Sequence, residues 1–385
     1  MAKIAVLGAG AWGTALAMHI SNQHQVSLWA RNAGHVSGMR KARANPLYLG
    51  DFQFNDNLQV EDNLSAAIDG ADLILSVVPT AGFRNILQEI NQLKSTKPIV
   101  WAHKGLEPQT AKLPHEVALE ELGSSQYWGA LSGPSFAAEL VRGLPTAVTL
   151  AANDAGFALH AANLIHGDNL RVYNSADVIG VSVGGAVKNV MAIAAGISDG
   201  MGFGNNARAA MITRGLAEIT RFGVALGAKT ETFMGLAGAG DLILTCTGQY
   251  SRNREVGLQL ASGKALDDVL KGLGHVAEGV NTAREVIRRA DSMGIDMPIT
   301  FEVNQALTHG KSAREAVMDL LGREQKAEHV WHVKIESINI CCRCVLHDFY
   351  CLLKNNFRDI NKDWHFCSKN AQQQYTRYFR KASRR

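Results

Sequence analysis

The chain has 385 residues, of which 46% are hydrophobic, enough for two globular domains with sizeable cores. The net charge of +4 is uneven, because residues 329–385 hold 11 Lys and Arg against four Asp and Glu, which leaves −3 on residues 1–328. The basic character therefore belongs to the tail and says little about whether the main body binds nucleic acid. We expect no nucleic-acid partner. The sequence has no run of 18 apolar residues and no recognisable signal peptide, so we expect a cytoplasmic protein without a membrane span.

The cysteines are also unevenly distributed. Cys246 precedes a cluster of five in the C-terminal tail, at Cys341, Cys342, Cys344, Cys351 and Cys367. A body with one cysteine is not a disulfide scaffold, which fits a reducing compartment. The tail cysteines could bind zinc, but their spacing does not follow a zinc-finger pattern, and we expect no metal site.

A glycine-rich turn follows the first predicted strand. Residues 4–7 form an apolar run, Gly8, Gly10 and Gly13 follow with the spacing G-x-G-x-x-G, and residues 14–20 have helical periodicity. This order is typical of dinucleotide binding, because Gly8 permits a tight turn, Gly10 lets a pyrophosphate approach the backbone, and Gly13 lets helix and strand pack closely. The phosphates would bind at the helix N-terminus. A purely structural glycine turn is the alternative.

The second predicted strand, at residues 25–30, is followed by Arg31 and Asn32. The usual fingerprint has an acidic residue in this region, which binds the ribose 2′-hydroxyl of NAD. Arg31 would instead stack on the adenine or meet a 2′-phosphate, so NADP is favoured or at least admitted. A solvated arginine at a strand end is the alternative.

Strand and helix patterns alternate over residues 1–175. Further strands are predicted at 71–78, 99–102, 129–132, 145–150 and 171–173, with a helix over 110–122. This alternation indicates a Rossmann domain with a doubly wound, mostly parallel sheet and helices on both faces. Ligands bind beyond the carboxyl ends of strands in such sheets, and Pro79, Lys104 and residues 132–135 follow predicted strands at that edge.

From about residue 176 the pattern becomes helical throughout. Residues 178–197 are typical of a buried helix, and residues 208–226 of an amphipathic one. Further helices are predicted at 231–235, 253–262, 265–272, 280–293, 300–308 and 312–321. We therefore expect an all-α domain over residues 176–326, followed by a Cys-rich basic tail at 327–385.

Lys188 lies deep within the first of these helices. Burial should lower its pKa from about 10.4 towards neutrality, which suits a general acid/base. Gly184 and Gly185 in the same helix cost about 1 kcal/mol each relative to Ala, which suggests close approach by another backbone or a ligand. Alternatively, Lys188 reaches the surface or pairs with a structural carboxylate.

Two later stretches add polar groups. Asp241 ends a glycine loop at 236–241 and could pair with Lys188, hold a substrate hydroxyl or cap a helix. Ser251, Arg252 and Asn253 lie at the start of a predicted helix, where a hydroxyl, a guanidinium, an amide and free backbone N–H groups suit a phosphate. A capped helix with a solvated basic turn is the alternative.

Seven motifs in order make residues 1–325 resemble the bacterial NAD(P)-dependent glycerol-3-phosphate dehydrogenase family. They are GAGAWG, WAHKGLE, LSGPSFAAE, GGAVKNV, GAGDL, CTGQYSRNR and VAEG. The resemblance implies reversible reduction of dihydroxyacetone phosphate to sn-glycerol 3-phosphate with NADPH or NADH, which supplies glycerophospholipid synthesis. The partner would be a small phosphorylated triose, and a homodimer is admitted. The tail 327–385 does not match, and we expect it to be poorly ordered and dispensable for catalysis.

Residue roles follow from the motif positions. By resemblance, Lys188 is the catalytic lysine, which gives a proton to the carbonyl oxygen as hydride arrives from the nicotinamide. The implied substrate contacts are Lys104, Gly133, Ser135, Lys188, Asp241, Ser251, Arg252 and Asn253. The implied cofactor contacts are Gly8, Gly10, Ala11, Trp12, Gly13, Arg31, Lys104, Ala137, Arg252, Val276 and Glu278. Asn189 and Thr245 resemble supporting polar residues of the family.

Two other functions remain open at this point. One is a related hydroxyacid or sugar-acid dehydrogenase with the same domain plan, and the other is a non-catalytic NAD(P)-binding module. The Ser-Arg-Asn-Arg stretch at 251–254 argues against the first, because it suits a phosphate. The second leaves Lys188, Asp241 and Arg252 without a purpose.

Overall fold

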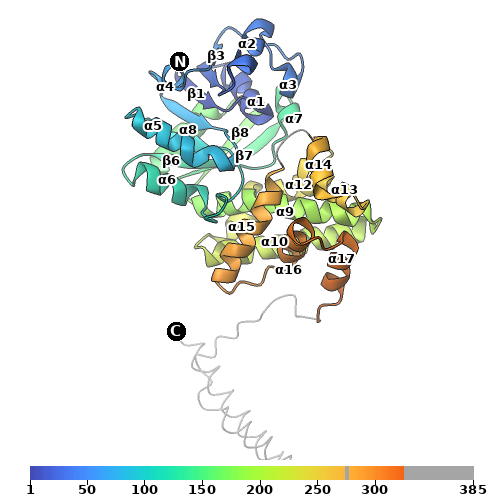
Figure 1. Cartoon of the computed structure of the whole chain (residues 1–385). Coiled ribbons are helices and arrows are strands. Elements are labelled where there is room, and N and C mark those ends of the chain that lie inside the picture. Colours follow the sequence, from blue (N-terminus) through green and yellow to red (C-terminus); the bar gives the residue numbers. More distant parts are fainter. Residues whose placement is uncertain (274–276, 325–385) are drawn as a thin grey trace, which may run out of the picture. The chain divides into compact units, whose positions relative to one another are not determined.

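The computed structural model describes residues 1–273 and 277–324, and Met1–Arg323 forms one compact unit (Figure 1). The boundary expected between residues 175 and 176 lies inside this unit and stays a prediction. The tail 327–385, with its five cysteines, lies outside the described residues.

Within the described residues, the N-terminal part contains an eight-stranded sheet of order β3-β2-β1-β4-β5-β6-β7-β8. The strands are β1 (Lys3–Leu7), β2 (Gln25–Trp29), β3 (Leu58–Glu61), β4 (Leu73–Ser76), β5 (Ile99–Trp101), β6 (Trp128–Ser132), β7 (Thr146–Ala152) and β8 (Leu170–Ser175). Among these strands β6 and β7 pair antiparallel, and the other neighbours pair parallel. The expected doubly wound, mostly parallel sheet is confirmed.

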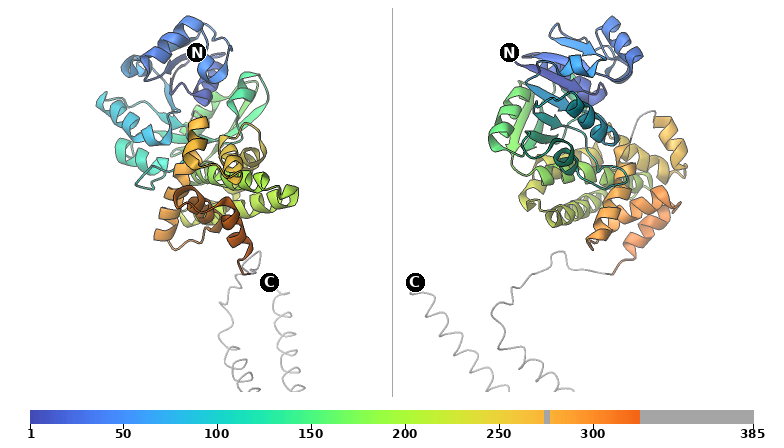
Figure 2. Two further views of the ribbon diagram at one scale, coloured as in Figure 1. Left: turned by 45° about the vertical axis from the view of Figure 1, so that its right-hand side comes forward. Right: turned by 60° about the vertical axis from the view of Figure 1, so that its left-hand side comes forward.

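Helices cover both faces of the sheet, as expected (Figures 1 and 2). The apolar core on one face includes side chains from α1 (Ala11–Ile20), α2 (Ala33–Ala42), α7 (Ala137–Val141) and α8 (Ala155–Ile165). The core on the other face includes side chains from α4 (Leu64–Ile68), α5 (Phe83–Gln92) and α6 (Pro114–Leu122). Two short elements, α3 (Pro46–Leu49) and η1 (Thr80–Gly82), lie in the connections.

Two elements of this part differ from the sequence-based expectation. Strand β3 was not predicted, because its four residues alternate between buried and less buried positions and give no apolar run. The helix predicted over 110–122 begins only at Pro114, which occupies the first helical turn. The residues before it form a loop whose side chains Leu106, Ala111 and Leu113 join a core of the helical part.

The helices that follow Asp177 gather at one end of the sheet part (Figures 1 and 2). They are α9 (Val178–Gly200), α10 (Gly204–Ala225), α11 (Thr230–Phe233), α12 (Asp241–Thr247), α13 (Arg252–Ala261), α14 (Leu266–Leu273), α15 (Glu278–Ser292), α16 (Pro298–Thr308) and α17 (Ala313–Leu321). Helix α9 contacts α10, α12, α13 and α15, so it forms the centre of this part. The predicted all-α region is therefore confirmed.

Helix α9 has the length and apolar composition of a membrane-spanning helix, but 89% of its most apolar window is buried inside the structure. The surrounding helices thus account for its apolar character, as expected of a core helix. Its two glycines meet close neighbours, as anticipated. A Cβ at Gly184 would overlap the carbonyl oxygen of Ala237, and one at Gly185 would lie 2.6 Å from the hydroxyl of Ser132.

The stretch expected to be a glycine loop before Asp241 has a different structure. Leu236–Gly240 forms a π-helical turn, η2, and Asp241 is the first residue of α12. Its side chain makes no capping hydrogen bond, because it points to cations elsewhere in the protein. Single-turn π-helices occur often at functional sites, and the carboxylate of Asp241 directly follows one.

Candidate active site

The glycine turn has the geometry that its spacing predicts. Gly8 has φ +116°, a conformation that favours glycine, and a Cβ there would lie 2.8 Å from the backbone of Val77. A Cβ at Gly13 would overlap the carbonyl oxygen of Gly8, so this glycine permits the close contact of helix and strand. Gly10 faces open space at the N-terminus of α1, since a Cβ there would have no atom within 4 Å. The backbone there can accept a pyrophosphate group.

The residues predicted to hold the rest of the cofactor lie at the carboxyl edge of the sheet. Ala11 and Trp12 are half-buried in the first turn of α1, and Ala137 begins α7. Arg31 follows β2 and is exposed, so its guanidinium is free to meet a ligand. Val276 lies outside the described residues.

The centre of the site is Asp241, whose carboxylate joins two lysines from different parts of the fold. Lys188 on α9 donates from Nζ to Oδ1 of Asp241, and also to the hydroxyl of Thr245 at 2.8 Å. Lys104, in the loop after β5, donates to Oδ2 at 2.6 Å and to the carbonyl oxygen of Gly133 at 3.0 Å. The pairing of Asp241 with Lys188, anticipated as one of three alternatives, is therefore confirmed.

Burial and charge determine the protonation of this cluster. The side chain of Lys188 is 8% exposed and that of Asp241 is 1% exposed. Burial, the largest effect, and the nearby Lys104 together lower the pKa of Lys188 to about 8, against the opposing effect of Asp241. Burial alone would raise the pKa of Asp241, but Lys104 and Lys188 hold it below its ordinary value. The expected lowering of the Lys188 pKa is thus confirmed.

Asparagines connect this cluster to the start of α13. Asn189, beside Lys188, donates to the carbonyl oxygen of Lys104 at 3.3 Å and accepts a hydrogen bond from Nδ2 of Asn253 at 3.0 Å. Asn253 in turn accepts from the backbone N–H of Gly279 at 3.1 Å. The side-chain amide of Asn253 is therefore already hydrogen-bonded within the protein. One of its partners is Asn189, the residue next to Lys188.

The neighbours of Asn253 differ in exposure. Ser251 is buried and its hydroxyl accepts from the backbone N–H of Arg254, so the capping interpretation holds for this residue. Arg252 is exposed and begins α13, where a guanidinium and a helix N-terminus lie together. Ser135 donates from its hydroxyl to the carbonyl oxygen of Gly133, the same oxygen that accepts from Lys104.

Two further polar residues belong to the site: Ser132, which lies in the range 132–135 expected at this edge of the sheet, and Thr80, which was not singled out from the sequence. The hydroxyl of Ser132, the last residue of β6, donates to Asp241 at 3.4 Å, and that of Thr80 donates to Glu278 at 3.3 Å. Thr80 comes shortly after the strand predicted at 71–78, which was the available signal. Burial raises the pKa of Glu278, against the opposing hydrogen bonds from Thr80 and the loop of Lys104.

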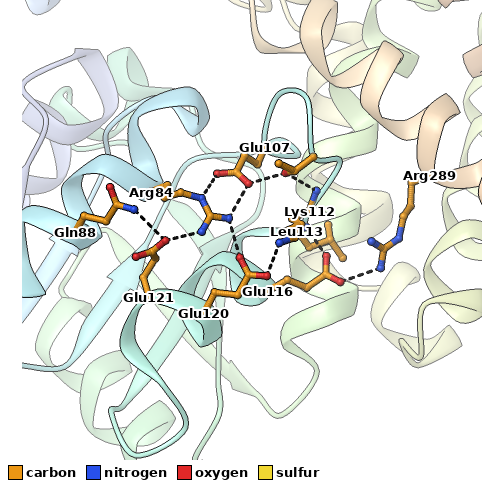
Figure 3. Close-up of polar contacts among 10 residues, drawn as sticks. Arg84, Gln88, Glu107, Lys112, Leu113, Glu116, Glu120, Glu121 and Arg289 are labelled. Carbon is orange, nitrogen blue, oxygen red and sulfur yellow. Dashed lines mark hydrogen bonds and ion pairs between the residues drawn. The ribbon is translucent and has the colours of Figure 1, made fainter.

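A network of ion pairs fixes the loop that carries Lys104 (Figure 3). Arg84 on α5 donates to both carboxylate oxygens of Glu107, at 2.7 and 2.8 Å, and also pairs with Glu120 and Glu121 on α6. This pairing holds the pKa of Glu107 below its ordinary value. A two-pronged contact of this kind restricts orientation as well as distance, so the residues following Lys104 are held in one arrangement.

The same network reaches the helical part. Glu116 on α6 pairs with Arg289 on α15 at 2.8 Å, and Gly105 lies between the hydroxyls of Thr80 and Thr282, which are 2.9 and 3.1 Å from the position of a Cβ there. The loop of Lys104 is thus enclosed between the sheet part and the helical part. Among the described residues, no group of three or more His, Cys, Asp or Glu side chains could hold a metal ion.

Comparison with known proteins places this site in a family. Residues 3–158 match the family model described as NAD-dependent glycerol-3-phosphate dehydrogenase N-terminus, and residues 177–318 match the corresponding C-terminus. The chain belongs to the NAD-dependent glycerol-3-phosphate dehydrogenase family. The resemblance inferred from the seven motifs is therefore confirmed.

Curated relatives in this glycerol-3-phosphate dehydrogenase family are similar over nearly their whole length. A glycerol-3-phosphate dehydrogenase (NAD(P)+) of Methylobacillus flagellatus is 71% identical over 326 residues, which cover 85% of this chain and 99% of the relative. One of Nitrosospira multiformis is 54% identical over 330 residues, with coverage of 85% and 99%.

Solved structures agree with the fold. The crystal structure of glycerol-3-phosphate dehydrogenase from Coxiella burnetii has a TM-score of 0.81 and 41% identity, and covers 84% of this chain and 99% of that one. D-mandelate dehydrogenase with NADH has a TM-score of 0.53 and 16% identity, over 82% of this chain and 99% of that one. The second likeness shows the shared fold alone.

Proposed function

We propose that this chain reduces dihydroxyacetone phosphate to sn-glycerol 3-phosphate with NADPH or NADH, and that it also catalyses the reverse reaction. The observation that carries the proposal is the buried cluster of Lys188, Lys104 and Asp241 beside the carboxyl edge of a dinucleotide-binding sheet. Membership of the family and the names of its curated relatives support the same activity.

Lys188 is the proposed general acid in the direction of reduction. A pKa of about 8 leaves most of the group protonated near neutral pH and makes its proton easier to release than that of an ordinary lysine. Hydrogen bonds to Asp241 and Thr245 fix the direction of the ammonium. NADPH or NADH, held over the glycine turn, would supply hydride for the carbonyl carbon, and Lys188 would supply the proton to the oxygen.

Lys104 is the proposed second cation near the reacting oxygen. Negative charge that develops on this oxygen would interact with both ammonium groups, and the interaction is strong because the site is largely buried. Asp241 offsets one of the two positive charges, which allows the lysines to stay close to each other. Removing the carboxylate would therefore affect both lysines.

The phosphate end of the substrate is proposed to bind at the start of α13. Arg252 supplies an exposed guanidinium there, and Asn253 and Ser251 lie on either side of it. The N-terminus of the helix adds a favourable electrostatic contribution for a dianion. This preference for a phosphorylated substrate separates the proposal from a hydroxyacid dehydrogenase with the same fold.

The cofactor is proposed to bind over the glycine turn at Gly8–Gly13. The open space at Gly10 fits the pyrophosphate, and Arg31 is free to meet the adenosine end. Ala137 and Glu278 would line the remainder of the binding site. NADP is favoured or at least admitted, because no acidic side chain follows β2.

A spectrophotometric assay of NADPH or NADH oxidation with dihydroxyacetone phosphate tests the proposal. We expect turnover with dihydroxyacetone phosphate and none with non-phosphorylated hydroxyacids or their keto forms. Activity with the non-phosphorylated compounds alone would favour the hydroxyacid dehydrogenase. Cofactor binding without oxidation on any phosphorylated triose would favour a non-catalytic module.

The same assay on a chain that ends at Lys326 tests whether the tail is needed, and we expect little change in rate. We also propose a cytoplasmic location and a homodimer. Cell fractionation and light scattering would test these two properties separately from the activity.

A further inference from the structure

A buried carboxylate near the end of α9 lies between two guanidinium groups. Asp199 follows Lys188 by eleven residues, about three helical turns, so both side chains leave the same side of α9. The side chain of Asp199 is only 5% exposed. Its Oδ2 accepts from Nε of Arg254 at 2.8 Å and lies 2.6 Å from a terminal nitrogen of the same guanidinium, and its Oδ1 accepts from Nε of Arg208 at 2.7 Å.

Arg254 belongs to the first turn of α13, two residues after Arg252. Its guanidinium contacts one carboxylate oxygen through two nitrogens, which the single nitrogen of a lysine cannot reproduce. Its backbone also lies against α9, since a Cβ at Gly196 would overlap the carbonyl oxygen of Arg254. The side chain and backbone of Arg254 are therefore both held by the helix that carries Lys188.

The preceding residue is held to the same helix. Asn253 donates to Asn189, which follows Lys188 directly in the sequence. Two consecutive residues of α13 thus connect to α9 at points ten residues apart, Asn189 and Asp199. Arg252 comes immediately before these two, and its backbone has little freedom to move relative to Lys188.

We propose that Asp199 is a positioning residue that acts through Arg254 to hold Arg252 and Asn253 at the phosphate end of the substrate. The inference rests on the proposed function, because it assigns the start of α13 to the phosphate. Asp199 touches neither substrate nor cofactor in this assignment. Its role is to set the distance between the proton donor on α9 and the phosphate contacts on α13.

The test is a double-mutant cycle with Asp199→Asn, Arg254→Gln and the double variant, since a cycle isolates the coupling between neighbours. Rates are measured with dihydroxyacetone phosphate and with non-phosphorylated dihydroxyacetone at high concentration. We expect each single variant to raise the KM for dihydroxyacetone phosphate by about tenfold, a change of about 1.4 kcal/mol in binding. The kcat/KM for dihydroxyacetone and the Kd for NADPH should change by less than about twofold. The double variant should be no worse than the more impaired single variant.

A matched control is Glu302→Gln. Glu302 has an 11% exposed side chain and pairs with Lys311 at 2.5 Å. This ion pair of the helical part is also largely buried, and neither residue is a proposed contact of substrate or cofactor. Its KM for both compounds should stay within about twofold of wild type. Arg254→Lys should give an intermediate KM, because it keeps the charge but offers one nitrogen instead of two.

Other outcomes would overturn the inference. Equal losses with dihydroxyacetone phosphate and dihydroxyacetone would mean that Asp199 supports the fold in general. Additive effects in the double variant would mean that Asp199 does not act through Arg254. NADPH binding shows that each variant is folded. Turnover of dihydroxyacetone phosphate by the wild type tests the proposed function independently. If the wild type is active and the variants keep its KM, the role of Asp199 is contradicted and the proposed function is not.

Discussion

The ammonium of Lys104 lies 2.6 Å from the carboxylate of Asp241, although 137 residues separate the two in the chain. The contact joins the loop after β5 to the start of α12, and so connects the sheet part to the helical part at one carboxylate. Because Lys188 binds the other oxygen of Asp241, the three side chains form one charged unit with a net charge of +1. The predictions below begin with this unit.

Replacing Lys188 by Met should lower kcat for reduction of dihydroxyacetone phosphate by about 10³-fold or more, because both proton transfer and electrostatic stabilisation are lost. Binding of NADPH should stay near that of wild type, since the glycine turn is untouched. Fluorescence titration with NADPH and steady-state rates measure the two effects. A Lys188→Met enzyme with normal turnover would contradict the role of the lysine.

The pH dependence of the wild-type reaction should also reflect Lys188. Reduction needs the protonated amine, so kcat/KM should be level below the pKa of about 8 and fall above it. In the Asp241→Asn variant this fall should begin at lower pH, because Asp241 raises the pKa of Lys188 in the wild type. A pH profile of kcat/KM for both proteins measures the shift, and a shift to higher pH would be inconsistent with this charge arrangement.

Two glycines of the turn should respond differently to alanine. Gly10→Ala should keep the thermal midpoint near wild type, because its Cβ enters open space, but raise the Kd for NADPH by about tenfold or more. Gly13→Ala should destabilise the fold by about 1–3 kcal/mol or more, because its Cβ overlaps the carbonyl oxygen of Gly8. Thermal unfolding and NADPH titration separate the two effects. Equal destabilisation by both changes would be evidence against a cofactor-binding role for Gly10 and a packing role for Gly13.

Arg31→Ala tests the proposed contact with the 2′-phosphate. The KM for NADPH should rise by about tenfold, while that for NADH should change little, because NADH lacks the phosphate. Asn32 beside it caps α2 through a hydrogen bond from the backbone N–H of His35, so the strand end should keep its structure. Steady-state kinetics with each cofactor give the ratio of the KM for NADPH to the KM for NADH. An unchanged ratio would indicate that Arg31 is a solvated side chain that does not contact the 2′-phosphate.

Glu218 should make stability depend on pH. It is 2% exposed on α10 and accepts hydrogen bonds from the backbone N–H groups of Ile299 and Thr300, and burial raises its pKa to about 7. Between its unfolded pKa of about 4.5 and about 7, the folded protein holds a proton that the unfolded chain releases. The raised pKa of Glu218 therefore adds about 3 kcal/mol to the free energy of unfolding below about pH 4.5. This stabilisation is lost as the pH rises to about 7.

Urea unfolding of wild type and Glu218→Gln at pH 4.5 and pH 8 measures this contribution. Glutamine does not titrate, so the difference in unfolding free energy between the two proteins removes the effects of all other groups. Wild type should lose stability relative to the variant as pH rises. A difference that stays constant with pH would show that the pKa of Glu218 is not raised.

Local geometry was predictable from the sequence where a single residue type determines it. Gly8 and Gly13 have the local roles that the spacing assigned, because the positive φ at Gly8 and the close approach at Gly13 leave no other residue type suitable, whereas Gly10 faces open space and its contact with a pyrophosphate stays a prediction. The burial of Lys188 was predictable for a similar reason. The apolar residues around it on α9 leave no exposed side for the helix, and the pKa is lowered accordingly.

Proximity across the fold was less predictable. The contact of Asp241 with Lys188 was one of three alternatives, and its contact with Lys104 was not foreseen as a pair. These distances depend on how α9 packs against η2 and β6, which no local pattern encodes. The π-helical turn before Asp241 was interpreted as a loop, since its glycines disfavour a helix and only the packing of Ala237 against Gly184 explains it here.

The glycines of α9 have a consequence for how the protein folds. Gly184, Gly185 and Gly196 lower the intrinsic helix stability of this segment by about 1 kcal/mol each, so the isolated segment should form little helix. It becomes helical when η2, β6 and α13 fill the space that these glycines leave. The two regions matched by separate family models should therefore not be autonomous in folding, and the helical region produced by itself should lack a cooperative unfolding transition.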